Sequence, residues 1–254
     1  MPLRVSVFIL LAALLTAPSR AQRDPLRVFI RAGEKTHGPA GNGLHDYPSF
    51  LADWTKLLTA RGATVEGALR FPTADELART DVLVIFKGDG GVCSPAERTL
   101  LQEYLTRGGG LVALHDGMCS DDAGWFATVA GAAKQHGERN YSPGPLKLTF
   151  VDRTHPIAQG LHDYEVDDEA FFLLTKAPGM RVLATSPLPL NGEVAPQVWT
   201  YERTLPGGSP YRAFVSMQGH HYKTFSIPAH QALILRGLAW AGKRDVDLLV
   251  SQEQ

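Results

Sequence analysis

The segment Gly-Gly-Gly-Leu-Val-Ala-Leu-His-Asp-Gly at residues 108–117 decides the fold class of this chain. Its apolar run at 111–114 is typical of a strand covered on both faces, and the Asp-Gly that ends the segment is a turn pair. A second buried strand is predicted at 81–86, which reads Asp-Val-Leu-Val-Ile-Phe. Between the two strands, a capping-box pair and a proline predict a helix at 95–107; the three residues are Ser94, Pro95 and Glu97. Strand, helix and strand in this order predict a parallel βαβ unit.

The same alternation extends toward the N-terminus. A β-rich run at 26–32 and a strand at 63–69 flank a helix that starts near Tyr47, and a short helix is expected at 73–80. These elements predict a parallel sheet with right-handed crossovers and helices on both faces. Ligands of such sheets bind beyond the carboxyl ends of the strands. The loops expected to form the site therefore start at Gly33, Lys87 and His115.

After about residue 130 the pattern changes to shorter runs that look antiparallel, at 146–151, 181–185, 197–201 and 211–217. Helical periodicity returns at 228–242. Because no linker divides the chain, residues 22–254 are expected to form a single α/β domain with a strand-rich C-terminal extension.

Residues 1–21 have the pattern of a secretory signal peptide. Arg4 precedes an uncharged run at 5–17, and small residues follow at Ser19 and Ala21. The run is shorter than the roughly 20 residues that span a bilayer. We therefore expect cleavage, a periplasmic or secreted protein, and no stable membrane insertion afterwards.

The composition excludes some partners. The chain of 254 residues has 25 basic and 26 acidic side chains and no run of Lys or Arg, so nucleic acid is not an expected partner. Gly88-Asp-Gly-Gly91 lacks both the Walker pattern and the dinucleotide pattern, so no nucleotide cofactor is expected. The two cysteines, Cys93 and Cys119, are either a disulfide or two separate thiols.

Histidines occur where predicted strands end. His115 follows one strand, His220 follows another, and His45 and His136 lie in loops. Neutral imidazoles bind divalent transition metals such as zinc, manganese or nickel. No local metal motif is present, so a metal site would be assembled from distant segments. The alternative is a set of partly buried imidazoles bonded to the backbone.

Asp167-Asp168-Glu169 precedes an apolar stretch. Buried carboxylates of this kind act as general acids or bases or bind metals, whereas a solvated acidic turn is the other interpretation.

Taken in order, several segments resemble the ThuA-like family, which is named for trehalose utilisation. They are 28–30, 81–91, 108–117, 155–161, Asp168-Glu169, 197–199, 218–220 and 236–240. The resemblance implies a flavodoxin-like, class I glutamine amidotransferase-like fold and an activity on oxidised (3-keto) glycosides. It also implies a divalent metal site, with the site residues His45, His115, His136, Glu169 and His220. Amidotransferases have a nucleophilic cysteine at the position of His115, so glutaminase chemistry is not expected.

The leading hypothesis is an exported enzyme that transforms a sugar or keto-sugar by elimination, hydration, isomerisation or hydrolysis. Its catalytic residues would be His115, Glu169 and Asp168, and its metal ligands His45, His115, His136 and His220. Contacts to the carbohydrate are expected from Trp199, Asp116, Asp89 and Tyr222. The competing hypotheses are a non-catalytic carbohydrate-binding module and an amidotransferase-like hydrolase that uses Cys119. The oligomeric state is left open.

Overall fold

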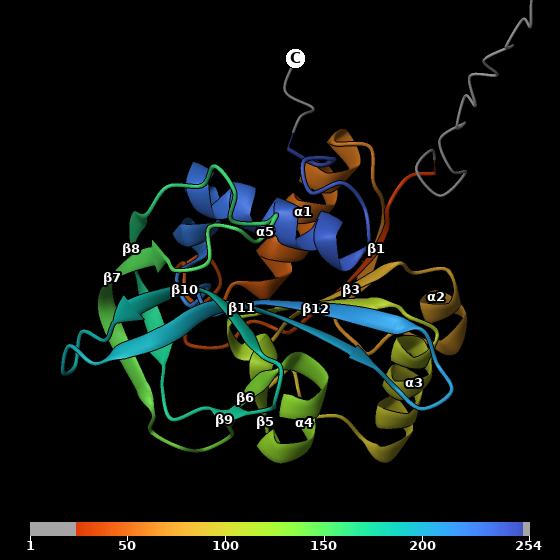
Figure 1. Cartoon of the computed structure of the whole chain (residues 1–254), viewed down its shortest axis with the longest axis horizontal. Helices are drawn as coiled ribbons and strands as arrows, with labels where there is room; N and C mark the ends of the chain where they lie inside the picture. The colour runs from red at the N-terminus through yellow and green to blue at the C-terminus, as the bar shows by residue number, and fades with distance from the viewer. Residues whose placement is uncertain (1–23, 251–254) are drawn as a thin grey trace, which may run out of the picture.

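A computed structural model of the chain describes residues 24–250, and its centre is a nine-stranded sheet (Figure 1). In spatial order the strands are β2 (Thr64–Ala68), β1 (Arg27–Ala32), β3 (Val82–Phe86), β4 (Gly110–Leu114), β12 (Pro210–Ser216), β11 (Val194–Thr204), β10 (Arg181–Pro187), β7 (Tyr141–Phe150) and β8 (Tyr164–Phe171). The expected signal peptide at 1–21 lies outside the described residues.

Helices and a small second sheet complete the fold. The helices are α1 (Tyr47–Ala60), α2 (Ala74–Ala78), α3 (Pro95–Thr106), α4 (Ala123–Ala130) and α5 (Pro228–Ala241), with 3-10 turns η2 (His115–Met118) and η3 (Tyr222–Ser226). The small sheet contains β5 (Cys119–Ser120), β6 (Ala132–Gln135) and β9 (Thr175–Lys176). In Figure 1, α1 and α5 lie on one side of the large sheet, and α2, α3 and α4 lie on the other. The prediction of an α/β fold with helices on both faces is therefore confirmed.

The large sheet is half parallel and half antiparallel. The pairs β2–β1, β1–β3, β3–β4 and β4–β12 are parallel. The pairs β12–β11, β11–β10, β10–β7 and β7–β8 are antiparallel. Because β12 pairs directly with β4, the strands predicted after residue 130 continue the same sheet. The architecture is a mixed α/β sheet with flanking helices, compatible with an amidotransferase-like fold.

Local sequence signals explain the helix boundaries. At α3 the Ser94 hydroxyl accepts a hydrogen bond from the Glu97 backbone N–H, and the Glu97 carboxylate accepts one from the Ser94 N–H. These bonds satisfy two donors that the first helical turn leaves free. The capping box predicted from the sequence is therefore confirmed. Thr73 and Glu76 form a second capping box that starts α2.

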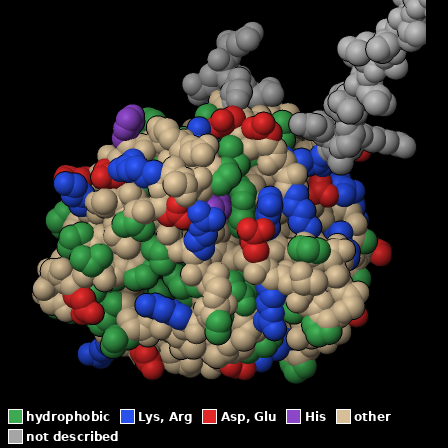
Figure 2. All heavy atoms as spheres, viewed as in Figure 1, with side chains coloured by type: hydrophobic (Ala, Val, Ile, Leu, Met, Phe, Trp, Pro, Cys, Tyr) green, Lys and Arg blue, Asp and Glu red, His purple; other side chains and the backbone are tan. Residues whose placement is uncertain are grey.

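Both cysteines are buried free thiols, so of the two interpretations the separate thiols are correct. Within residues 24–250, no helix has the length and apolar character needed to cross a bilayer. On the face shown in Figure 2, acidic and basic side chains are interspersed.

Candidate three-histidine site

Three histidines meet at the carboxyl ends of the central parallel strands. His45 lies in the loop between β1 and α1, His115 directly follows β4, and His220 follows β12. The His45 Nε2 atom is 3.1 Å from His115 Nε2 and 2.7 Å from His220 Nδ1. The His45 backbone N–H donates to the His220 carbonyl at 3.0 Å, which ties two of the loops together. We call His45, His115 and His220 the three-histidine cluster.

The backbone that carries the cluster is strained. His45 and His115 have φ angles of 44° and 48°, and nearby His37 and Asp89 have 60° and 50°. L-residues other than glycine rarely adopt this left-handed region, and holding one there costs on the order of 1 kcal/mol or more. Gly219, with φ of 145°, leaves no room for a side chain, since an added Cβ would lie 3.1 Å from His115 Cβ. Strain of this kind concentrates at functional sites.

A hydrogen-bond partner fixes which ring nitrogen of His115 carries hydrogen. The Nδ1 atom of His115 is 2.9 Å from the Met217 carbonyl oxygen, which only accepts, so Nδ1 is the donor. In the neutral ring the Nε2 atom of His115 therefore carries an unshared electron pair, and this atom lies 3.1 Å from His45 Nε2. The Nδ1 atom of His45 is 3.1 Å from the Thr36 hydroxyl, which can donate or accept, and 3.4 Å from Asp116 Oδ2.

Protonation of His45 and His220 is disfavoured in the folded chain. Burial, with the neighbouring imidazoles His115 and His220, holds the pKa of His45 far below its usual range. Burial also lowers the pKa of His220 to about 4. At neutral pH these rings are therefore unprotonated, which is the form that binds metals. Neutral imidazoles whose outer N–H is held by a carboxylate or carbonyl are typical zinc and transition-metal ligands, so the residues present fit a divalent metal.

Two carboxylates border the cluster. The Glu169 Oε2 atom is 3.8 Å from His220 Nδ1, and its side chain is 12% exposed. Burial raises the pKa of Glu169 above its usual value, which makes this carboxylate a stronger base. Asp116, 17% exposed, contacts His45 Nδ1 at 3.4 Å and accepts a hydrogen bond from the Tyr47 hydroxyl at 3.1 Å.

Asp168, expected among the catalytic residues, is fully buried and its oxygens are occupied by neighbouring groups. It accepts hydrogen bonds from the backbone N–H groups of Gly219 and His220, at 3.2 and 3.0 Å for Oδ1. The Thr224 hydroxyl also donates to Oδ2 at 2.5 Å. Its position indicates that Asp168 holds the loop that carries His220.

His136, expected as a fourth ligand, lies outside the cluster. Its Nδ1 atom is 2.7 Å from Asp89 Oδ1, and the two side chains are 56% and 39% exposed. His136 follows β6 of the small sheet, and that strand directs it toward the loop after β3. The geometry therefore corrects the expected ligand set to His45, His115 and His220.

One of the expected carbohydrate contacts, Trp199, needs correction. Trp199 lies in the core at 0% exposure, and its Nε1 donates to the Ala130 carbonyl at 2.9 Å, so its ring does not face a ligand. Tyr222 is half-buried and its hydroxyl donates to Asp53 Oδ2 at 2.6 Å.

Cys119 is buried, and burial raises the pKa of its thiol well above the usual range, which argues against a cysteine nucleophile.

Sequence reasoning missed two residues beside the cluster. The ring of Phe171 stacks on that of His115 with a centroid separation of 4.9 Å, and the ammonium of Lys134 lies 5.3 Å from the Phe171 ring centroid. Phe171 is two residues after Glu169 on β8, so strand alternation places both on the same face. That alternation was the available signal for Phe171.

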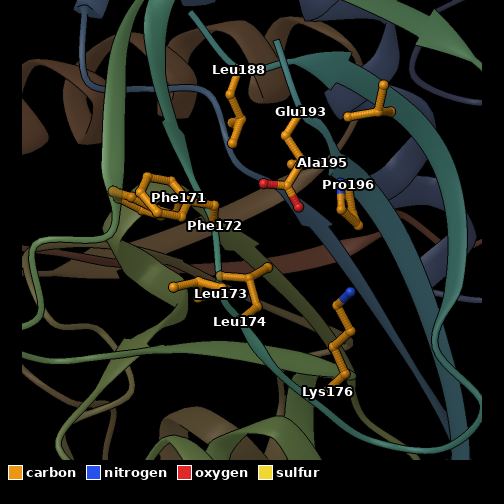
Figure 3. A pocket seen from close by; sticks show the side chains of 10 residues that line it. Phe171, Phe172, Leu173, Leu174, Lys176, Leu188, Glu193, Ala195 and Pro196 are labelled. Carbon is orange, nitrogen blue, oxygen red and sulfur yellow. The ribbon is translucent and has the colours of Figure 1, made fainter. Parts of the chain in front are cut away.

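A separate cavity of about 300 Å³ lies at the end of β8 (Figure 3). Its lining includes Phe171 and Leu173 from β8 and the loop that follows, together with Leu188, Glu193 and Pro196 from the β10–β11 hairpin. No member of the three-histidine cluster lines it. The cluster and this cavity are therefore distinct features that share one wall residue.

Comparisons with known proteins agree with the fold. The family model described as ThuA, trehalose utilisation, matches residues 38–241, a range that includes all three cluster histidines. A ThuA-like protein from Bacteroides uniformis is 17% identical with a TM-score of 0.70, over 92% of this chain and 100% of that chain. Another from Parabacteroides merdae is 19% identical with a TM-score of 0.67, over 86% and 90%.

A β-galactosidase from Rahnella is 17% identical with a TM-score of 0.57, over 87% of this chain and 31% of the enzyme. At these identities the likenesses show a shared fold. Among curated proteins, none matches the sequence significantly.

Proposed function

Because the chain belongs to the ThuA family, as the resemblance in its sequence predicts, we propose that it is an exported enzyme that acts on a 3-keto-glycoside at the three-histidine cluster. The observation that carries this proposal is the convergence of three histidine ring nitrogens next to Glu169, whose carboxylate is 3.8 Å from His220 Nδ1. Export is inferred from the pattern of residues 1–21.

His45, His115 and His220 would hold a divalent transition metal. When bound, such an ion supplies positive charge that polarises a carbonyl oxygen. The chain itself contributes the orientation of the ligands. The Met217 carbonyl accepts a hydrogen bond from His115 Nδ1, and the Thr36 hydroxyl is hydrogen-bonded to His45 Nδ1. Partners of this kind fix the tautomer and the direction of the electron pairs.

Glu169 is the proposed base. A ketone at C3 of a sugar acidifies the C–H bond at C2, and a partly buried carboxylate with a raised pKa is suited to accept that proton. The electrons of the C2–H bond then form the C1–C2 double bond, and the C1–O bond breaks with its electron pair on the departing oxygen. That oxygen takes up a proton and leaves as an alcohol, so the step is a balanced elimination that needs no oxidant or reductant.

Metal analysis tests the cluster. Tag-free mature protein, reconstituted with zinc, manganese or nickel and dialysed, is expected to retain near-stoichiometric metal by mass spectrometry. His115→Ala should lose the metal, because the two ring nitrogens that remain are too few ligands to hold it. The matched control His162→Ala removes an exposed histidine and should retain the metal. Equal metal content in all three proteins, or none in the wild type, would contradict the site.

Turnover tests the reaction. Wild-type protein is expected to release 4-nitrophenol from 4-nitrophenyl 3-keto-glucoside, whereas Glu169→Gln should keep its metal and lose roughly 10²–10⁴-fold in rate, the usual effect of removing a positioned base. Binding of this compound without turnover by the metal-loaded wild type would favour a carbohydrate-binding module.

A further inference from the structure

His136 and Asp89 form a pair that the proposed reaction has not used. The His136 Nδ1 atom is 2.7 Å from Asp89 Oδ1, within ion-pair distance of the protonated ring. The His136 backbone N–H donates to the Ser120 carbonyl at 2.7 Å, which anchors the end of β6. Within residues 24–250 the Nε2 atom of His136 has no hydrogen-bond partner. The pair therefore presents one ring nitrogen to solvent in a fixed orientation.

Stability does not explain this pair. Both side chains are substantially exposed, at 56% and 39%, and exposed ion pairs contribute roughly 0–1 kcal/mol. Asp89 has a φ of 50°, a left-handed conformation that costs on the order of 1 kcal/mol for a residue other than glycine. The gain does not exceed the cost, so the arrangement is better explained by a role at the site.

The pair lies against the turn that carries the cluster. The Gly90 backbone N–H donates to the Asp116 carbonyl at 2.9 Å, and the Gly91 N–H donates to the Cys119 carbonyl at 2.8 Å. An added Cβ on Gly90 would lie 2.7 Å from Gly117 Cα, so the two segments are in direct contact. Asp116 in that turn contacts His45. One turn therefore connects the His136–Asp89 pair to the three-histidine cluster.

We propose that His136, oriented by Asp89, is the acid that protonates the departing oxygen. This inference rests on the proposed elimination, in which Glu169 removes the C2 proton and the C1–O bond breaks. The imidazolium Nε2–H transfers its proton to the departing oxygen, which leaves as an alcohol, and the neutral imidazole regains a proton from solvent. The Asp89 carboxylate, 2.7 Å from Nδ1, stabilises the imidazolium by its negative charge.

Leaving-group dependence tests this role. Methyl 3-keto-glucoside expels a strongly basic alkoxide that needs protonation, whereas the 4-nitrophenyl compound expels a stable phenolate that does not. His136→Gln is expected to lower kcat on the methyl compound by roughly 10²–10⁴-fold and to leave kcat on the nitrophenyl compound within a few-fold of wild type. Asp89→Asn should show the same selective loss, less severely. The metal content of both variants should equal that of the wild type.

The outcomes separate this inference from the proposed function. An equal loss on both compounds, or no loss on either, would overturn the acid role of His136 while turnover by the wild type stands. A wild type that turns over neither compound would overturn the proposed function itself. His162→Gln, which replaces an exposed histidine distant from Asp89 in sequence, is the matched control and should leave both rates unchanged.

Discussion

The three-histidine cluster and His230 show two outcomes for a buried imidazole. In both places burial lowers the histidine pKa, to about 4 for His220 and to about 4 for His230. His230, on α5, lies alone in the core, where its Nδ1 meets the Tyr164 hydroxyl at 2.9 Å and its Nε2 has no partner. In the cluster, three histidine rings converge on one another. Burial keeps His220 and His230 neutral at pH 7. What distinguishes the cluster as a possible ligand set is that its ring nitrogens converge.

Metal-dependent stability is the largest expected difference between the two kinds of histidine. A metal that binds only the folded state adds about 4 kcal/mol at a free concentration of 1,000 times its Kd. Chelation should therefore lower the Tm of the wild type, and His45→Ala should abolish this response. The measurement is thermal unfolding with zinc and with a chelator.

His155→Ala is the matched control, because His155 is also buried but packs its ring against Trp240 at a centroid distance of 5.2 Å. This variant should be less stable with and without metal and should keep the full metal response. The proposed difference between converging and isolated histidines would be contradicted if zinc still raised the Tm of His45→Ala. It would also be contradicted if zinc no longer raised the Tm of His155→Ala.

The isolated histidine, His230, should make the stability of the fold depend on pH. Its pKa is about 4 in the folded chain, against an ordinary value of 6.5, so the unfolded chain binds the proton more tightly. The free energy of unfolding should therefore fall as the pH decreases from 6.5 to 4, by up to about 3 kcal/mol from this group. In His230→Gln that part of the acid sensitivity should be missing.

Urea unfolding at several pH values measures this effect, and the quantity to compare is the difference between wild type and variant. Both proteins should be free of metal, so that changes at the cluster do not enter. Parallel curves for the two proteins between pH 7 and 4 would show that His230 does not contribute to acid destabilisation.

The sequence predicted the parallel half of the fold because its signals are local. The capping box at Ser94 and the apolar run that precedes His115 each lie within a few residues of the feature that they specify. The rule that ligands bind at the carboxyl ends of parallel strands pointed to the loops that hold His45 and His115. His220 was grouped with them only through the resemblance to the ThuA-like family, because the strand before it was expected to be antiparallel, whereas β12 runs parallel to β4.

The errors at the site arise from contacts between distant segments. His136 and Trp199 were assigned to the site by position along the chain, but β6 turns His136 toward Asp89, and β11 places Trp199 in the core. No local pattern distinguishes the face of a strand that lies under a helix from the face that borders a cleft. Strand alternation on β8 would have linked Phe171 to Glu169, yet not to His115, because that contact joins residues far apart in sequence.

The smallest expected effect concerns Asp168, which orients a ligand without contacting the cluster nitrogens. It accepts hydrogen bonds from the backbone N–H groups of Gly219 and His220 and from the Thr224 hydroxyl. In Asp168→Asn one oxygen becomes an amide NH₂ that cannot accept, so the loop carrying His220 should be held less firmly. Loss of such a partner typically weakens metal affinity 10–100-fold, which corresponds to about 1–3 kcal/mol.

Competition with a metal indicator measures that affinity. The matched control is Asp167→Asn, which removes an adjacent exposed carboxylate whose ion pair with Lys223 spans 3.0 Å. Both variants replace a β8 carboxylate by an amide of the same shape. A greater loss of affinity in Asp168→Asn is the result expected from loop anchoring. Equal losses in the two variants would contradict a role of Asp168 in holding His220.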